Sequence, residues 1–124
     1  MKNTRKTILI VDDSSLVVER LIELLEKEES VASIEVAKDY EHAIQILAEK
    51  KSDVVFLDIH LPGKNGIDLL KFISPTYPNV KVVMLSNESN PYYRKLCITN
   101  GASFFIDKSK EFELIPQILT SLND

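Results

Sequence analysis

The stretch TILIVDDSSL, from Thr7 to Leu16, carries the pattern from which the fold can be predicted. Four apolar residues, Ile8–Val11, end abruptly in two adjacent acids, Asp12 and Asp13. A short unbroken apolar run is typical of a strand that is covered on both faces. Adjacent carboxylates repel each other, and burying either of them without a partner is costly. We therefore expect a positively charged group at the end of this strand.

Four further predicted strands follow along the chain, and segments of helical periodicity lie between the strands. The predicted strands are Ile8–Val11, Ser33–Ala37, Asp53–Asp58, Lys81–Leu85 and Ser103–Ile106. The first predicted helix is Ser14–Glu29, and the second has Asp39 as its N-cap and carries Tyr40, Ala43, Ile44 and Leu47. A short helix carries Ile67, Leu70 and Ile73, and another lies between Asn90 and Gly101. The last is Glu111–Leu122, where Pro116 either kinks the helix or starts its regular part. Strands that alternate with helices form a parallel sheet with helices on both faces. The sequence thus predicts one α/β domain over residues 1–124, a doubly wound (βα)5 fold.

The composition argues against several classes of protein. The 124 residues carry a formal net charge of -4, whereas nucleic-acid binding is driven by clustered Lys and Arg. No apolar run approaches the roughly 18 residues of a membrane-spanning helix, so we expect neither nucleic acid nor a membrane as a direct partner. The single cysteine, Cys97, falls among apolar positions. It fits a reducing cytoplasm and predicts a buried core thiol.

Chemically active side chains stand at the ends of four of the five predicted strands. Asp12 and Asp13 follow the first strand, Asp58 ends the third, Ser86 follows the fourth and Lys108 follows the fifth. The carboxyl ends of parallel strands meet at one edge of the sheet, where doubly wound proteins bind their ligands. We therefore expect three carboxylates, one hydroxyl and one ammonium group to converge there.

This set of side chains predicts a metal-dependent phosphoryl site. Three aspartates and one lysine sum to a charge of -2 (three negative charges and one positive), which a divalent cation neutralises. Oxygen ligands favour Mg²⁺ or Mn²⁺ over zinc, and a metal with open positions most often meets a phosphoryl oxygen. Lys108 and the Ser86 hydroxyl can take other oxygens of the same group. Carboxylates form phosphoryl intermediates, so Asp58 is the candidate nucleophile.

The combination of these motifs resembles a known family. The acid pair Asp12–Asp13, the loop DIHLPGKNG from Asp58 to Gly66, Ser86, and the stretch FIDKS from Phe105 to Ser109 together resemble the response-regulator receiver domains of two-component signalling, the group typified by the bacterial chemotaxis regulator. The match runs over essentially the whole chain. It implies a flavodoxin-like sheet with strand order 2-1-3-4-5.

The resemblance also implies a function, that of a phosphoacceptor signalling domain that is not a classical enzyme. Asp58 would receive a phosphoryl group from the phosphohistidine of a sensor histidine kinase or of a phosphotransfer protein. Mg²⁺ would be bound by Asp13, Asp58 and the main-chain carbonyl of His60, with Asp12 acting through water. Such a phosphorelay works in the cytoplasm.

A conformational switch is the further implication. Lys108 and Ser86 would contact the phosphoryl oxygens, and Phe105 falls on the family's switch-aromatic position. Its rotation would change the face formed by the helix after Asn90, the strand Ser103–Ile106 and the closing helix, through which we expect a downstream protein to bind. Side chains alternate along a strand, and from this alternation we expect Phe105 to lie at the margin of the sheet while its neighbours face the core.

The chain departs from the usual pattern of the family near the site. Asn87 stands where a small residue is usual, which would restrict access to the phosphoryl group. Ser109 replaces a common proline after the lysine, and because a cis bond before a non-proline residue costs about 3–4 kcal/mol we expect a trans Lys108–Ser109 bond. His60 and Glu88 occupy variable flanking positions and would tune the lifetime of the phosphoryl group.

Three other functions fit parts of the sequence. A flavodoxin-like cofactor carrier needs a loop after its first strand that cradles phosphate, and the acids of DDSS repel it. A phosphatase of the haloacid-dehalogenase type also uses an aspartyl nucleophile with Mg²⁺, but it has two acids separated by one residue where this chain has an adjacent pair. A degenerate receiver that serves only as a docking module would not need the complete set of site residues that this chain retains.

Overall fold

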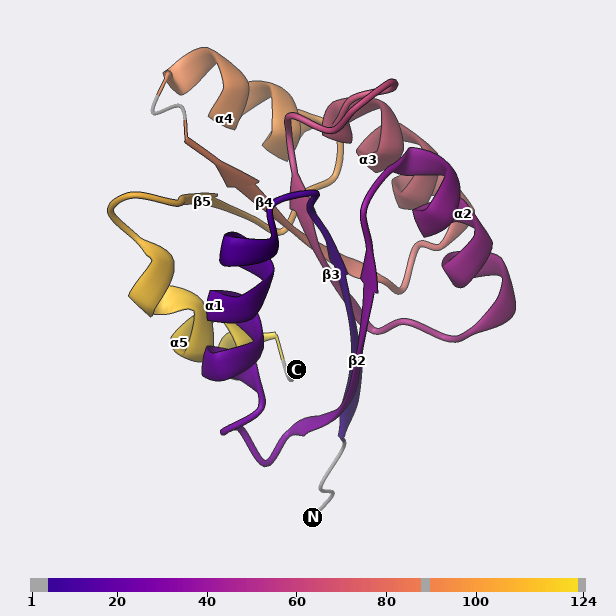
Figure 1. Cartoon of the computed structure of the whole chain (residues 1–124). Helices are drawn as coiled ribbons and strands as arrows, with labels where there is room; N and C mark the ends of the chain where they lie inside the picture. Colours follow the sequence, from indigo (N-terminus) through magenta and orange to yellow (C-terminus); the bar gives the residue numbers. More distant parts are fainter. Residues whose placement is uncertain (1–4, 88–89, 123–124) are drawn as a thin grey trace.

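The computed structural model describes residues 5–87 and 90–122, which form a five-stranded parallel sheet with helices on both faces (Figure 1). The strands are β1 (Lys6–Val11), β2 (Val31–Ala37), β3 (Val54–Asp58), β4 (Lys81–Ser86) and β5 (Phe104–Asp107). The helices are α1 (Ser15–Leu25), α2 (Tyr40–Glu49), α3 (Gly66–Thr76), α4 (Pro91–Thr99), the 3₁₀ turn η1 (Phe112–Leu114) and α5 (Ile115–Ser121). The predicted alternation of strands and helices is confirmed.

The strands lie in the order β2-β1-β3-β4-β5, and every neighbouring pair is parallel, as the resemblance implied. The register aligns their carboxyl ends at one edge. Val11 pairs with Ala37 on one side and with Leu57 on the other. Further along, Ser86 pairs with Asp107. The residues that follow these positions are therefore gathered at this edge, although they come from distant parts of the chain.

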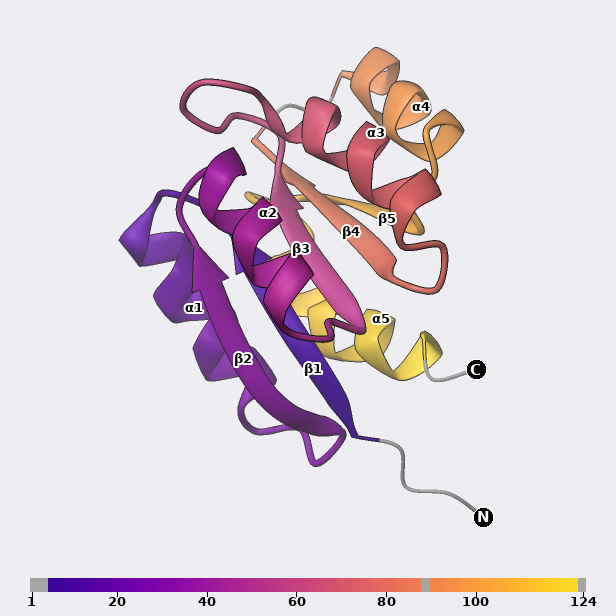
Figure 2. The same cartoon turned by 90° about the vertical axis from the view of Figure 1, so that its right-hand side faces the viewer.

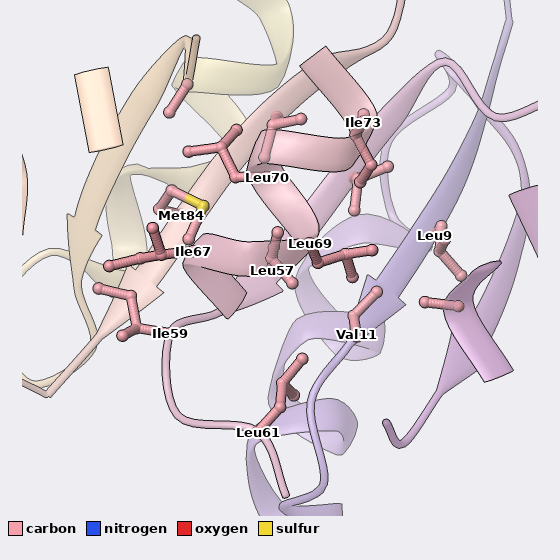
Figure 3. Close-up of a cluster of buried hydrophobic side chains, with 14 of the residues drawn as sticks. Leu9, Val11, Leu57, Ile59, Leu61, Ile67, Leu69, Leu70, Ile73 and Met84 are labelled. Atoms are coloured by element: carbon pink, nitrogen blue, oxygen red, sulfur yellow. The ribbon is translucent and has the colours of Figure 1, made fainter. Parts of the chain in front are cut away.

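The sheet separates two hydrophobic cores. α2, α3 and α4 cover one face and α1 and α5 the other, as the two views in Figures 1 and 2 show. In Figure 3 the side chains of α3, among them Ile67, Leu70 and Ile73, pack over Leu57 of β3 and Met84 of β4. Because both faces are covered, the central strands are apolar at successive positions, as expected for a parallel sheet. β3 is buried along its whole length.

Side-chain caps fix where most helices begin. Ser14, Asp39, Asn65 and Asn90 each accept a hydrogen bond from a backbone N–H in the first turn of the helix that follows, which satisfies a group without an intrahelical partner. The predicted N-cap at Asp39 and the predicted start of a helix at Asn90 are confirmed. α4 ends at the predicted stop, with Gly101 in the left-handed region at a φ of 108°.

Two of the predicted helices differ from the observed ones. α1 ends at Leu25, four residues before the predicted end at Glu29, because the segment EKEE that follows offers no apolar residue and puts acids at the negative end of the helix dipole. At the end of the chain, a 3₁₀ turn precedes α5, and Pro116 lies in the first turn of α5. Pro116 thus starts the regular helix and does not kink it.

The only cysteine lies in the core, as predicted. Cys97 of α4 is fully buried, and burial raises the pKa of its thiol to about 11. A thiol held neutral in this way is a weak nucleophile at neutral pH. Across residues 5–87 and 90–122, none of the helices is both long enough and apolar enough to span a bilayer.

Candidate functional site

Three carboxylates meet at the carboxyl edge of the sheet. Asp12, Asp13 and Asp58 each offer an oxygen, and these three oxygens lie within 4.8 Å of one another. Asp12 is 1% exposed and Asp58 is 5% exposed, whereas Asp13 faces solvent. The Asp12 carboxylate also accepts a hydrogen bond from the Ser14 N–H (2.9 Å) in the turn between β1 and α1.

The positive group expected beside the acid pair is Lys108, which follows β5. Its Nζ lies 2.9 Å from Oδ2 of Asp12 and 3.2 Å from Oδ1 of Asp58. Burial and the nearby Asp12 carboxylate raise the pKa of Asp58, while the Lys108 ammonium lowers it, and the net direction is upward. With three carboxylates and one ammonium group, the site carries excess negative charge.

Hydrogen bonds on three consecutive residues hold the backbone around Lys108. The Asp107 N–H donates to Oε1 of Glu111 (3.0 Å), and the Lys108 N–H donates to the Ser86 carbonyl oxygen (2.7 Å). The Ser109 N–H and hydroxyl both donate to Oδ1 of Asp107, at 2.8 and 2.7 Å, and these bonds are the main cause of the lowered pKa of Asp107. The Lys108–Ser109 peptide bond is trans, as expected.

Sequence reasoning missed the roles of Asp107 and Glu111. The Asp-x-Ser spacing from 107 to 109 is a signal that could have found the first, because an aspartate often bonds the backbone two residues further on. No local pattern reveals that Glu111 bonds back to the Asp107 N–H.

Ser86 and Asn87 lie at the end of β4. Ser86 is fully buried, and the register of β4 with β5 places it beside Asp107, one residue before Lys108. The side chain of Asn87, the next residue, is exposed, and its expected effect on access to the site stays a prediction. Glu88, the other predicted flanking residue on this loop, lies outside the described residues.

The loop after β3 is anchored against Asp58 itself. His60 is exposed, and its backbone N–H donates to Oδ1 of Asp58 at 3.3 Å. At the far end of the loop the Gly66 N–H donates to the Ile59 carbonyl oxygen (2.7 Å). A Cβ at Gly66 would collide with the Asp58 carbonyl oxygen and lie 2.9 Å from the Ile59 Cα. The close approach of α3 to the end of β3 thus requires glycine, which sequence reasoning did not single out.

The expectation that Phe105 lies at the margin of the sheet is wrong. Its side chain is 4% exposed and packs in the core under α2, α3 and α4, and the Arg94 guanidinium lies 5.0 Å from its ring centroid. The next residue, Ile106, is equally buried but belongs to the opposite core. Alternation along β5 therefore separates two cores, and it does not separate a core from a margin, because helices cover both faces of this sheet.

The donor set fits a small, hard divalent cation. Carboxylate oxygens are the ligands of Mg²⁺ and Mn²⁺, and nitrogen or sulfur donors favour zinc. Within the described part of the chain, the cluster of Asp12, Asp13 and Asp58 contains no histidine or cysteine ligand. Its exposed member, Asp13, leaves one side of the cluster open to solvent.

This doubly wound parallel sheet carries an acidic cluster that suits a cation and a buried lysine that suits an anionic group, both at its carboxyl edge. The family model of the response regulator receiver domain matches residues 8–120, and the chain belongs to this family. Receiver domains are the phosphoacceptor domains of two-component signalling. They bind Mg²⁺ at an acidic pocket, and they interact with histidine kinases or phosphotransfer proteins and with downstream effectors.

Relatives and solved structures agree with this assignment. The chain is 29% identical to the transcriptional regulatory protein LnrK of Bacillus subtilis (94% of this chain and 53% of LnrK) and 31% identical to the Fimbriae Z protein of Escherichia coli (94% and 58%). It thus spans about half the length of the curated relatives it matches. The beryllofluoride-activated receiver domain of DrrB superposes with a TM-score of 0.86 over 96% of this chain and 97% of that one at 21% identity, a likeness of fold alone.

Proposed function

We propose that Asp58 is the phosphoacceptor of a single receiver domain formed by residues 1–124. The observation that carries this proposal is the position of Asp58 between Lys108, 3.2 Å away, and the carboxylates of Asp12 and Asp13. A nucleophilic oxygen there stands beside a positive charge and beside acids that can hold a cation. Both are needed to bring an anionic phosphoryl group next to a carboxylate.

The cation in this proposal is Mg²⁺, with Mn²⁺ as a substitute, bound by Asp13, Asp58 and the main-chain carbonyl of His60, with Asp12 acting through water. When bound, the cation neutralises negative charge on the phosphoryl oxygens. The chain's own residues do the rest. Lys108, already paired with Asp12 and Asp58, holds a second phosphoryl oxygen with its ammonium group.

The remaining site residues have supporting roles. The hydroxyl of the buried Ser86 donates a hydrogen bond to a phosphoryl oxygen. Asn87, Glu88 and His60 set how readily water reaches the phosphoryl group. On phosphorylation, rotation of Phe105 changes the face formed by α4, β5 and α5, where a downstream protein binds. The phosphoryl donor is a phosphohistidine of a sensor histidine kinase or phosphotransfer protein in the cytoplasm, where a free cysteine is stable in its reduced form. The domain promotes its own phosphorylation and dephosphorylation and is not a classical enzyme.

Phosphorylation by a small donor tests this proposal. With Mg²⁺ and acetyl phosphate, an Asp58 oxygen attacks phosphorus, the bond from phosphorus to the acetyl oxygen breaks, and acetate leaves. Intact-mass measurement should show the gain of one phosphoryl group, and hydroxylamine should remove it because an acyl phosphate is labile to that nucleophile. Asp58→Asn should show no gain, and the exposed control Asp68→Asn should behave as the wild type. A gain that survives in Asp58→Asn would overturn the assignment.

A further inference from the structure

One carboxylate oxygen connects the phosphoryl site to the surface of α4. Oε1 of Glu111, in the turn between β5 and η1, accepts the Asp107 N–H at 3.0 Å. The same oxygen lies 3.5 Å from Nη2 of Arg94, which projects from α4. Glu111 is only half-buried, and its carboxylate therefore contacts both the backbone next to Lys108 and a side chain of a different element.

The first contact fixes the backbone that carries the site lysine. Glu111 and Asp107 are joined twice, because the Glu111 N–H donates to the Asp107 carbonyl oxygen (2.8 Å) while the Asp107 N–H donates to the Glu111 side chain. This reciprocal pair closes a ring immediately before Lys108. The direction in which Lys108 leaves the backbone therefore depends on the Glu111 side chain.

The second contact covers the aromatic side chain of β5. Arg94 pairs with Glu111 and lies over the Phe105 ring at 5.0 Å from its centroid. Beside them is a cavity of about 220 Å³ lined by Arg94, Phe105, Asp107, Lys110 and Glu111. The ion pair thus closes over Phe105 from outside, next to a space into which neighbouring side chains can move.

We propose that Glu111 is a positioning residue that couples Lys108 to the covering of Phe105 by Arg94. The inference rests on the proposed function, since it gives Lys108 its role at the phosphoryl group. The hydrogen bond from Asp107 sets the position of Lys108, and the charge of Glu111 keeps Arg94 over Phe105. When Lys108 moves towards a phosphoryl group on Asp58, it strains the pair of hydrogen bonds between Asp107 and Glu111. The Glu111 carboxylate is then displaced, and its ion pair with Arg94 weakens.

Two substitutions at Glu111 separate these roles. Glu111→Gln keeps an oxygen that accepts the Asp107 N–H but removes the charge that pairs with Arg94. Glu111→Ala removes both. Arg94→Gln removes the ion pair from its other side, and Glu113→Gln is the matched control, because Glu113 is an exposed acid two residues further along the same segment.

The first measurement is the rate of phosphorylation by acetyl phosphate at fixed Mg²⁺, followed by intact mass. Glu111→Ala should be slower by about five-fold, the effect of one lost hydrogen bond on an equilibrium or a rate. Glu111→Gln, Arg94→Gln and Glu113→Gln should stay within about two-fold of the wild type, because the bond to Asp107 is kept in all three.

The second measurement is the fluorine NMR signal of Phe105 in fluorophenylalanine-labelled protein, assigned with Phe105→Leu and recorded without and with beryllofluoride. An exposed ion pair changes an equilibrium by about two- to five-fold. Without phosphate, Glu111→Gln and Arg94→Gln should therefore shift the Phe105 signal part of the way towards its beryllofluoride position, and Glu113→Gln should not. A stabilising role without coupling would lower the melting temperature and leave this signal in place.

The outcomes distinguish the inference from the proposed function. A wild type that gains no phosphoryl group overturns the proposed function. A wild type that does, together with a Glu111→Ala protein as fast as wild type, overturns the role of Glu111 at Lys108. Unchanged Phe105 signals in both Glu111→Gln and Arg94→Gln overturn the coupling. Glu111→Gln is an isosteric change and Arg94 is an exposed residue. The Glu111→Gln and Arg94→Gln proteins therefore test the coupling even if Glu111→Ala does not fold.

Discussion

Lys108 and Asp12, 96 residues apart in the sequence, form an ion pair of 2.9 Å in which both side chains are almost fully buried. They follow β5 and β1, which are not neighbours in the sheet, since β3 and β4 lie between them. The lysine side chain therefore reaches across the carboxyl ends of two strands and meets Asp58 at the end of β3 on the way. One side chain thus links three of the five strands at this edge.

Lys108→Ala should destabilise the protein in the absence of divalent cations. It leaves Asp12 and Asp58 buried without their positive partner, and breaking a buried ion pair in this way costs about 3 kcal/mol. Urea unfolding in EDTA measures the loss, and Mg²⁺ should restore part of it. Lys110→Ala, which removes an exposed lysine two residues away, should change the free energy of unfolding little. Equal effects of the two substitutions would contradict a buried ionic network.

Asp58→Asn should stabilise the metal-free protein at neutral pH by about 1 kcal/mol, within the range that single stabilising substitutions commonly give. The pKa of Asp58 is raised in the folded state, so folding is penalised wherever this carboxylate must be ionised. The penalty is present above the folded-state pKa and disappears as the pH falls towards the value of the unfolded chain. The difference in unfolding free energy between Asp58→Asn and wild type should therefore narrow on acidification. A difference that widens at low pH would show that the sign is wrong.

Mg²⁺ should raise the melting temperature of the wild-type protein in a concentration-dependent way, because it binds the folded state and relieves the repulsion among the three aspartates. Asp13→Ala should reduce this shift, because it removes the exposed member of the cluster. Glu19→Ala, an exposed acid on α1, is the control and should leave the shift unchanged. A flat Mg²⁺ titration of the wild type would count against a cation site.

Gly66→Ala should destabilise the protein by about 1–3 kcal/mol, the usual cost of inserting atoms into a packed site. Its Cβ would meet the Asp58 carbonyl oxygen, so the end of β3 or the start of α3 must move, and phosphorylation by acetyl phosphate should slow as well. Gly63→Ala provides the comparison, since its Cβ meets no atom within 4 Å but its φ is 76°. It should cost about 1 kcal/mol and leave phosphorylation intact.

The strands and the residues of the site were predictable because their signals are local. A short apolar run that ends in an aspartate identifies both β1 and β3 in the sequence. Parallel topology then brings Asp12, Asp13, Asp58 and Lys108 to one edge without any knowledge of side-chain contacts. The structure adds the distances that make these four residues one network.

Features that depend on packing between elements could not be predicted in this way. The requirement for glycine at position 66 comes from a backbone oxygen of another element. The pairing of Arg94 with Glu111 depends on how α4 sits beside the end of β5. Phe105 was placed at the margin because alternation tells which face of a strand a side chain occupies but not what covers that face.

The two cores on opposite faces of the sheet have a practical consequence for protein engineering. Phe105 and Ile106 are adjacent in the chain but pack in different cores, and the backbone of the sheet stands between them. Substitutions in the two layers that lie more than about 7–10 Å apart and share no contacts should have nearly additive effects on the free energy of unfolding. A designer can therefore stabilise the layer of α1 and α5 by improving its packing, and leave unchanged the layer in which we propose that Phe105 moves.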